Sequence, residues 1–111
     1  MKIKELAEIC GFECLNEITV SREVEGAYCC DLLSWVIGRA REKDALITVM
    51  TNQNVVAVAV MADLPCIILS EGVQVDPLII EKATDNDLQV LRSLYTTYET
   101  AIKVHQALQG I

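Results

Sequence analysis

Residues 45–69, which read ALITVMTNQNVVAVAVMADLPCIIL, decide the fold. Residues 45–50 and 65–69 have the length and the β-branched content of buried strands. Residues 55–64, between them, are ambiguous, because their valines favour a strand whereas their alanines and their length favour a buried helix. We interpret them as a helix, because two parallel strands need a crossover connection. The stretch therefore predicts a β-α-β unit.

The N-terminal part of the chain continues this alternation. In order, we expect a helix over 2–10, a strand over 12–15, a loop over 16–25, a strand over 26–30 and a helix from 32 to about 38. Gly11 is suited to end the first helix, and Asp31 is suited to cap the second.

The C-terminal part adds one further strand between two helices. Asp76 and Pro77 predict the start of a helix that runs to about residue 86, and residues 88–91 predict the last strand. Thr96 and Glu99 form a capping-box pair for the last helix. We expect that helix to carry an apolar face with these members: Tyr98, Ala101, Ile102, His105 and Leu108.

Composition fits one small domain of this kind. The chain has 111 residues, of which 52% are hydrophobic and only 5% aromatic, so the core must be built from aliphatic side chains. Alternating strands and helices then predict one α/β domain over residues 1–111, a three-layer α/β/α structure with a mostly parallel sheet.

Charge and hydropathy limit the classes of binding partner and the cellular compartments that we expect for this chain. The net charge of −7, from nine basic and sixteen acidic residues, argues against nucleic acid and against an anionic membrane surface. The longest apolar run, residues 55–62, is far shorter than the ~20 residues that cross a bilayer. No signal peptide is visible, so we expect a cytoplasmic protein.

The chain has no recognisable catalytic motif. The five glycines are isolated, at positions 11, 26, 38, 72 and 110, so neither a P-loop nor a G-x-G-x-x-G turn can be drawn. No serine lies in a G-x-S-x-G elbow. The single histidine, His105, has no obvious nucleophile partner, and no carboxylate pair stands out. We therefore expect no enzyme activity and no catalytic residues.

The five cysteines admit three interpretations. No C-x-x-C spacing occurs, and the neighbours Cys29 and Cys30 would point to opposite faces of a strand, so we expect no metal site and no cofactor. An odd number of cysteines without an export signal fits reduced structural thiols. A thiol sensor that uses Cys29 and Cys30 stays open as a weaker alternative.

Polar residues gather where the predicted parallel strands end. In an open α/β sheet, ligands bind beyond the carboxyl ends of the strands, where helix N-termini present free N–H groups. We expect a small anionic or nucleotide-like ligand there, held by residues from four strand ends: Asp31, Thr51, Asn52, Asn54, Ser70, Glu71, Gly72 and Arg92. The alternative is that these residues only form turns and helix caps.

The helix over residues 55–64 has no polar side chain before Asp63. A helix that is apolar on all sides must be covered on all sides, which predicts self-association, most simply a twofold homodimer. The second hypothesis for the function is an interaction or assembly subunit without a ligand of its own. It would dock this helix and the last helix onto a protein partner such as a redox enzyme.

Three segments together resemble the DRTGG-domain family. They are SREVEGAYCCDLLSWV at residues 21–36, ITVMTNQN at 47–54 and ILSEG at 68–72, and the resemblance extends over nearly the whole chain. It implies an α/β/α fold similar to the N-terminal domain of HPr kinase/phosphorylase. It also implies a regulatory or assembly module whose associated chemistry lies elsewhere.

The residues that give this family its name are largely replaced here. The family pattern has Gly-Asp-Arg after the third strand, where this chain has Thr51-Asn52-Gln53. It has Thr-Gly-Gly after the next strand, where this chain has Ser70-Glu71-Gly72. Gly72 is retained and Ser70 is a near substitute. Without a nucleotide-cradling loop, the resemblance carries no kinase activity over to this chain.

Overall fold

The β-α-β unit predicted over residues 45–69 is present in the computed structural model, which describes all 111 residues. Strand β3 (Asp44–Thr48) and strand β4 (Cys66–Leu69) are parallel neighbours, and helix α3 (Gln53–Met61) connects them. Every residue of both strands is buried. That burial is typical of a parallel sheet covered by helices on both faces.

The other elements complete a single five-stranded sheet. They are α1 (Ile3–Cys10), β1 (Glu13–Cys14), β2 (Gly26–Cys29), α2 (Leu33–Val36), α4 (Pro77–Asp85), β5 (Gln89–Arg92) and α5 (Thr97–Gln109). The strand order is β1-β5-β4-β3-β2. Strands β2 to β5 are parallel, and only β1 runs antiparallel, paired with β5. The predicted α/β fold with a mostly parallel sheet is therefore confirmed.

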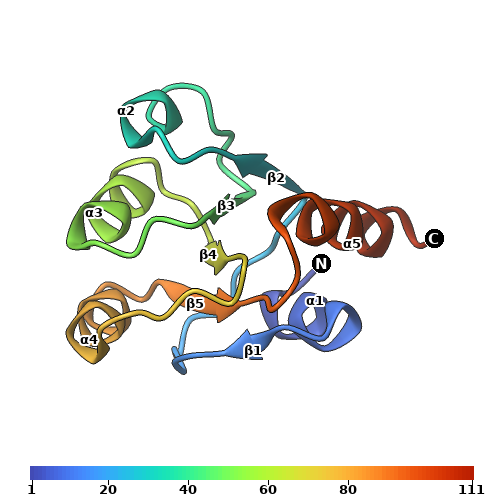
Figure 1. The fold of residues 1–111 in the computed structure, drawn as a ribbon, viewed down its shortest axis with the longest axis horizontal. Helices are drawn as coiled ribbons and strands as arrows, with labels where there is room; N and C mark the ends of the chain where they lie inside the picture. The colour runs from blue at the N-terminus through green and yellow to red at the C-terminus, as the bar shows by residue number, and fades with distance from the viewer.

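Helices form a layer on each side of this sheet. Helices α1 and α5 cover one face, and α2, α3 and α4 cover the other (Figure 1). Alternate strand residues supply the two cores: Ile47 and Ile68 pack on the α1/α5 side, whereas Leu46 and Ile67 pack on the α3/α4 side. None of the helices has both the length and the apolar character to cross a bilayer.

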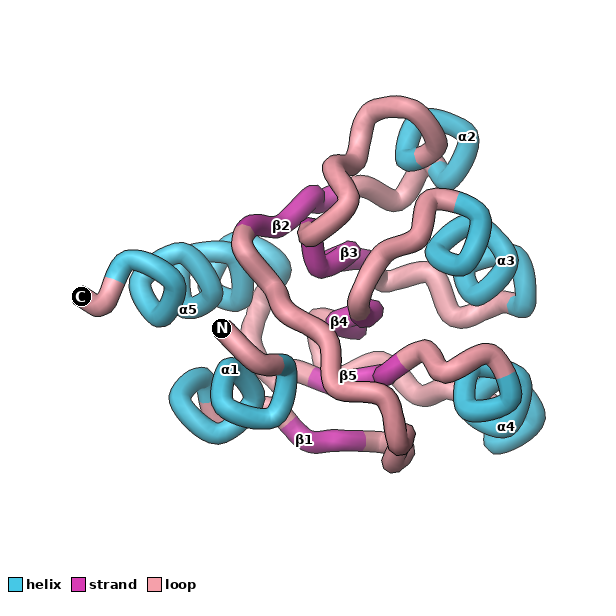
Figure 2. The backbone as a smooth tube through the Cα atoms, turned by 180° about the vertical axis from the view of Figure 1, so that it is seen from behind, coloured by secondary structure: helices cyan, strands magenta, loops and turns pink.

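A long connection crosses the amino ends of the strands. Because β1 and β2 are the two edge strands, residues 15–25 must pass the whole width of the sheet (Figure 2). We call this segment the crossing loop. It contacts residues that immediately precede β4 and β3: Arg22 donates to the carbonyl oxygens of Leu64 and Asp63, and the Glu25 N–H donates to Lys43.

Asp31 does not cap a helix, contrary to the prediction. Helix α2 is only four residues long, and its N-cap, Leu32, makes no side-chain capping bond. The Asp31 carboxylate instead accepts hydrogen bonds from the Thr48 hydroxyl (2.8 Å) and the Val49 N–H (3.0 Å). The Thr48 hydroxyl in turn accepts from the Met50 N–H. The N–H groups of Val49 and Met50 therefore bond to side chains rather than to a neighbouring strand. This explains why β3 ends at Thr48 rather than at residue 50.

The predicted apolar face of α5 is correct for Ala101 and Leu108, which pack against the core, and wrong for its other three members. The helix buries Thr100, Val104 and Ala107, whereas Tyr98 is 76% exposed and His105 is exposed. The Thr100 hydroxyl forms a buried hydrogen bond of 2.7 Å with that of Ser93, so a threonine occupies an inward position. Since a satisfied hydroxyl can be buried at little cost, hydropathy alone misses Thr100 as part of the inward face.

Candidate functional site

The eight predicted site residues all lie at or just beyond the carboxyl ends of the parallel strands. Backbone hydrogen bonds join these ends in order: Cys30 N–H to Ile47, Ser70 N–H to Thr48, and Ser93 N–H to Leu69. Three helices of eight residues or more, α3, α4 and α5, begin on this side of the sheet. Helices α3 and α5 start closest to their strand ends, and their N-termini differ sharply in what surrounds them.

The N-terminus of α5 is occupied by the protein's own side chains, and we call it the closed end. The Glu71 carboxylate accepts from the Thr97 N–H at 2.7 Å, and the Ser70 and Thr97 hydroxyls form a hydrogen bond of 2.7 Å. Thr96 and Glu99 form the predicted capping box. The positions that an anion would take at this helix are thus largely filled.

The turn after β4 directs Glu71 toward α5. Glu71 and Gly72 both have a φ of 63°. Their N–H groups donate to Tyr95 and Ser93, each at 2.8 Å, so the turn is tied to the β5–α5 connection. The positive φ favours glycine at position 72, where a Cβ atom would lie 3.4 Å from the Leu94 side chain, close to ordinary van der Waals contact.

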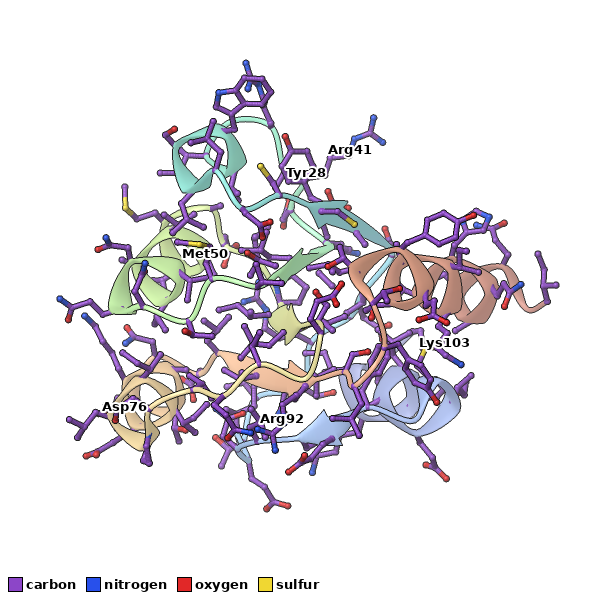
Figure 3. All side chains as sticks on the ribbon, viewed as in Figure 1. Tyr28, Arg41, Met50, Asp76, Arg92 and Lys103 are labelled. Atoms are coloured by element: carbon purple, nitrogen blue, oxygen red, sulfur yellow. The ribbon has the colours of Figure 1, made fainter.

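Arg92 is not directed toward the helix N-termini. Its Nη2 atom lies 2.9 Å from the Glu13 carboxylate of β1, and Figure 3 shows its side chain on the β1 side of β5. Its Nε atom is buried without a hydrogen-bond partner. The only cation among the predicted site residues is therefore engaged by an acidic residue that the sequence-based prediction missed.

The N-terminus of α3 is unoccupied by comparison, and we call it the open end. Asn52 is its N-cap and accepts from the Asn54 N–H at 2.9 Å. The backbone N–H groups of residues 51–53 donate to no group of the chain. The Asp31 carboxylate lies next to this turn through its bond to Val49, and its Oδ2 atom accepts no hydrogen bond.

The thiols are poorly placed for nucleophilic chemistry. Burial raises the pKa of the Cys66 thiol to about 12. Partial desolvation raises the pKa of Cys29, and the Asp31 carboxylate and Cys30 add to the effect. Because the thiolate is the reactive form, both sulfurs are weak nucleophiles at neutral pH. All five cysteines are free, and no three His, Cys, Asp or Glu side chains are grouped to hold a metal ion.

The structure adds residues that sequence reasoning missed. Thr97 binds both Ser70 and Glu71, and Thr48 binds Asp31. Thr97 follows a recognisable N-cap, so the sequence indicates that its N–H has no partner within the helix. The sequence does not indicate that Glu71 supplies that partner. Three surface hollows lie away from the carboxyl edge, one of them beneath the crossing loop.

Comparison with known proteins agrees with this architecture. The sequence pattern of the DRTGG domain matches residues 5–107. No curated protein matches the chain. Among solved structures, the crystal structure of the CBS and DRTGG domains of the regulatory region of Clostridium perfringens pyrophosphatase, complexed with its activator diadenosine tetraphosphate, is similar in fold.

The TM-score to that structure is 0.72 at 16% sequence identity. The match covers 95% of this chain but only 46% of the pyrophosphatase chain, so this chain corresponds to about half of that regulatory region. The likeness in fold and the match over residues 5–107 lead to one conclusion: this chain belongs to the DRTGG domain family.

Proposed function

We propose that this chain is a non-catalytic regulatory domain that binds a nucleotide-like ligand at the open end of the carboxyl edge. The observation that carries the proposal is the group of three unpartnered N–H groups at residues 51–53, in the same turn whose start, at Thr48 and Val49, binds the Asp31 carboxylate. Donors and an acceptor side by side suit a ligand that has both a phosphate and hydroxyl groups.

Each half of such a ligand has a chemical counterpart here. A phosphate group accepts from helix N-terminal amides and is favoured by the positive end of the helix dipole. A ribose hydroxyl donates to a carboxylate, as in dinucleotide-binding α/β sheets. Asn54, which is exposed, offers a further amide to the phosphate. The nucleotide activator bound by the similar pyrophosphatase regulatory region supports this class of ligand.

In this proposal the closed end borders the ligand rather than binding its phosphate. Glu71 would repel a phosphate from α5 because its carboxylate is negatively charged, and it already occupies the Thr97 N–H. Ser70 and Gly72 hold the turn that positions it, and Arg92 is neutralised by Glu13. The ligand's phosphate is thereby directed to α3.

Amide chemical shifts measured by NMR test this proposal. The ¹⁵N-labelled full chain is titrated with AMP, ATP and diadenosine tetraphosphate. We expect the largest shifts at Asp31 and residues 51–54, with much smaller shifts at residues 96–99. No shift with any of the three nucleotides at millimolar concentration would contradict the proposal.

A matched pair of variants locates the site. Gln53→Glu places a carboxylate at the open end. The carboxylate would repel the ligand's phosphate, so nucleotide binding should weaken by roughly tenfold. Gln106→Glu makes the same change on an exposed position near the far end of α5 and should leave binding unchanged. Equal loss in both variants would indicate a general charge effect.

Exposed apolar side chains support a second candidate function, self-association or docking. On α3, Val55, Val56, Val58 and Ala59 are buried, but Val60 is 42% and Met61 70% exposed. On α5, Tyr98 is 76% exposed. Because α3 and α5 cover opposite faces of the sheet, one flat partner surface cannot cover both (Figure 1).

We propose a twofold homodimer through Val60 and Met61 of α3. Light scattering coupled to size exclusion should give twice the monomer mass at micromolar concentration. Met61→Glu should produce the monomer, and Tyr98→Lys, on the opposite face, should remain dimeric. A monomer for the unmodified chain would contradict the dimer. We also propose a cytoplasmic location, supported by the five free thiols.

A further inference from the structure

A hollow of about 200 Å³ lies beneath the crossing loop, at the amino ends of the strands and so at the opposite edge of the sheet from the open end. Three cations line it: Lys2, Lys4 and Arg22. Ile3 and Ile18 form apolar parts of its wall, and Gln89, the first residue of β5, also lines it. The volume is below the roughly 300–1,000 Å³ of pockets for drug-sized ligands, so an occupant must be small.

The charge around this hollow is unusual for an acidic chain. Three of the nine basic residues line it, while the chain as a whole carries a net charge of −7. Lys2 and Lys4 form no ion pair, whereas Arg22 is paired with Asp63. Lys4 is therefore free to interact with a bound group, while the charge of Lys2 also acts on Glu23, whose carboxylate pairs with the N-terminal ammonium at 2.9 Å.

Helix α1 begins at this hollow, and its N-terminus has no cap. Its N-cap residue is Lys2, which makes no side-chain capping bond. The Ile3 N–H faces the Arg22 carbonyl through the antiparallel bridge between Lys2 and Glu23, whereas the N–H groups of Lys4 and Glu5 donate to no group of the chain. Lysines are disfavoured at a helix N-terminus because the dipole is positive there. A bound anion would satisfy both the lysines and the free amides.

Gln89 supplies a second, independent indication of a ligand. The residue is only 1% exposed, and its Nε2 atom donates to the carbonyl oxygen and the Oδ1 atom of Asn16. Its Oε1 atom has no hydrogen-bond partner in the chain. Among side-chain polar atoms that are fully shielded from solvent, only Arg92 Nε lacks a partner. Gln89 Oε1 is therefore not fully shielded, and the hollow that Gln89 lines gives access to it. Because this acceptor is not sealed inside the protein, a donor group of a molecule bound in the hollow can reach it.

We propose that this hollow binds a small organic anion that carries a hydroxyl or amino group. The anionic group lies against the N-terminus of α1 with Lys2 and Lys4, and the hydroxyl or amino group donates to Gln89 Oε1. Phosphate esters and hydroxycarboxylates share this chemistry. The site uses none of the residues of the open end, so each site stands or fails by itself.

The test is an NMR titration of the ¹⁵N-labelled full chain, with any purification tag at the C-terminus. The probes are glycerol 3-phosphate, malate and sulfate; sulfate is a dianion without a donor. We expect glycerol 3-phosphate or malate to shift the amides of residues 3–5 and 18–22 and the Gln89 side-chain NH₂. Sulfate should bind at least about tenfold more weakly, because it leaves Gln89 Oε1 unpaired. The stronger of the two organic probes identifies the anionic group.

Variants separate the anion contact from the donor contact. Lys4→Gln should weaken the organic probe roughly tenfold, and Lys82→Gln, on an exposed position of α4, should not. Gln89→Met should abolish the preference for the organic probe over sulfate. If that variant unfolds because it loses its hydrogen bonds to Asn16, the Lys4→Gln variant and the sulfate titration still test the proposal. No shifts at millimolar probe, shifts at residues 51–54 instead, or equal binding of sulfate would overturn the proposal.

Discussion

Helices α3 and α5 begin at the same edge of the same sheet, yet only one of them has a free N-terminus. At α5, Glu71 and the capping box fill the helix end, whereas at α3 the N–H groups of residues 51–53 have no partner in the chain. The difference does not come from the helices, because both have good N-caps, Thr96 and Asn52. It comes from the loop after the neighbouring strand.

The β4–α4 turn makes this difference. Two consecutive residues with positive φ, Glu71 and Gly72, bring a carboxylate onto the neighbouring helix. The β2–α2 connection places Asp31 on Thr48 and Val49 instead, short of the α3 amides. Whether a helix N-terminus in an α/β sheet can take a ligand is therefore decided by side chains from the adjacent strand end.

The largest expected effect is on the closed end. Ser70→Ala should lower the free energy of unfolding by about 1–3 kcal/mol, because it removes a buried hydroxyl and leaves Thr97 without that partner. Thr51→Ala at the open end, where the side chain makes no hydrogen bond, should change it by less than about 0.5 kcal/mol. Urea unfolding measures both, and equal losses would break the distinction between the two ends.

A smaller loss is expected when the carboxylate that closes α5 is removed. Glu71→Ala should cost about 1 kcal/mol, the usual worth of a capping group, because the Thr97 N–H loses its acceptor. Glu81→Ala, an exposed position on α4, serves as the control for the loss of one acidic side chain. A Glu71→Ala variant as stable as the control would show that the carboxylate does not close the helix.

The opposite sign is expected when a carboxylate is added to the open end. Gln53→Glu should raise the free energy of unfolding by about 0.3–1 kcal/mol, since a negative charge in the first turn of a helix is favourable. This is the same variant that should weaken nucleotide binding. Thermal unfolding at low ionic strength measures the gain, and a destabilised variant would mean that the α3 N-terminus is not free.

The smallest effect is a pH dependence that, of the two helix ends, affects only the closed end. The backbone N–H of Thr96, and then its hydroxyl, donate to Glu99 and lower the pKa of that carboxyl below its ordinary value of 4.5. The stabilisation is therefore complete above the ordinary pKa and is lost as the pH falls through the lowered pKa of the folded state. In an acid titration followed by NMR, residues 97–100 should lose their helical structure at a higher pH than residues 53–56. In the Glu99→Gln variant the two segments should no longer differ in this way.

Much of the fold could be predicted because periodicity and capping residues act locally. The β-α-β unit, the Asp76–Pro77 helix start and the Thr96–Glu99 capping box follow from a few adjacent residues, and all are present. The inward position of Thr100 on α5 could not be predicted. It depends on the buried bond between Ser93 and Thr100, which is a tertiary contact that makes a threonine a core residue.

The candidate site was only partly predictable for the same reason. The rule that parallel strands end at one edge predicted that the eight residues lie at that edge, as they do. It could not show that Glu71 reaches Thr97 or that Arg92 reaches Glu13, since these contacts join residues 26 and 79 positions apart. The hollow under the crossing loop was missed because residues 16–25 carry no periodic pattern.

Amide hydrogen exchange, measured residue by residue by NMR on the unmodified chain, tests the difference between the two helix ends most directly. We expect the Thr97 N–H, bonded to Glu71, to be protected, and the Asn52 and Gln53 N–H groups to exchange at rates near those of an unstructured peptide. A rapidly exchanging Thr97 N–H together with protected amides at Asn52 and Gln53 would contradict the assignment of a closed and an open end.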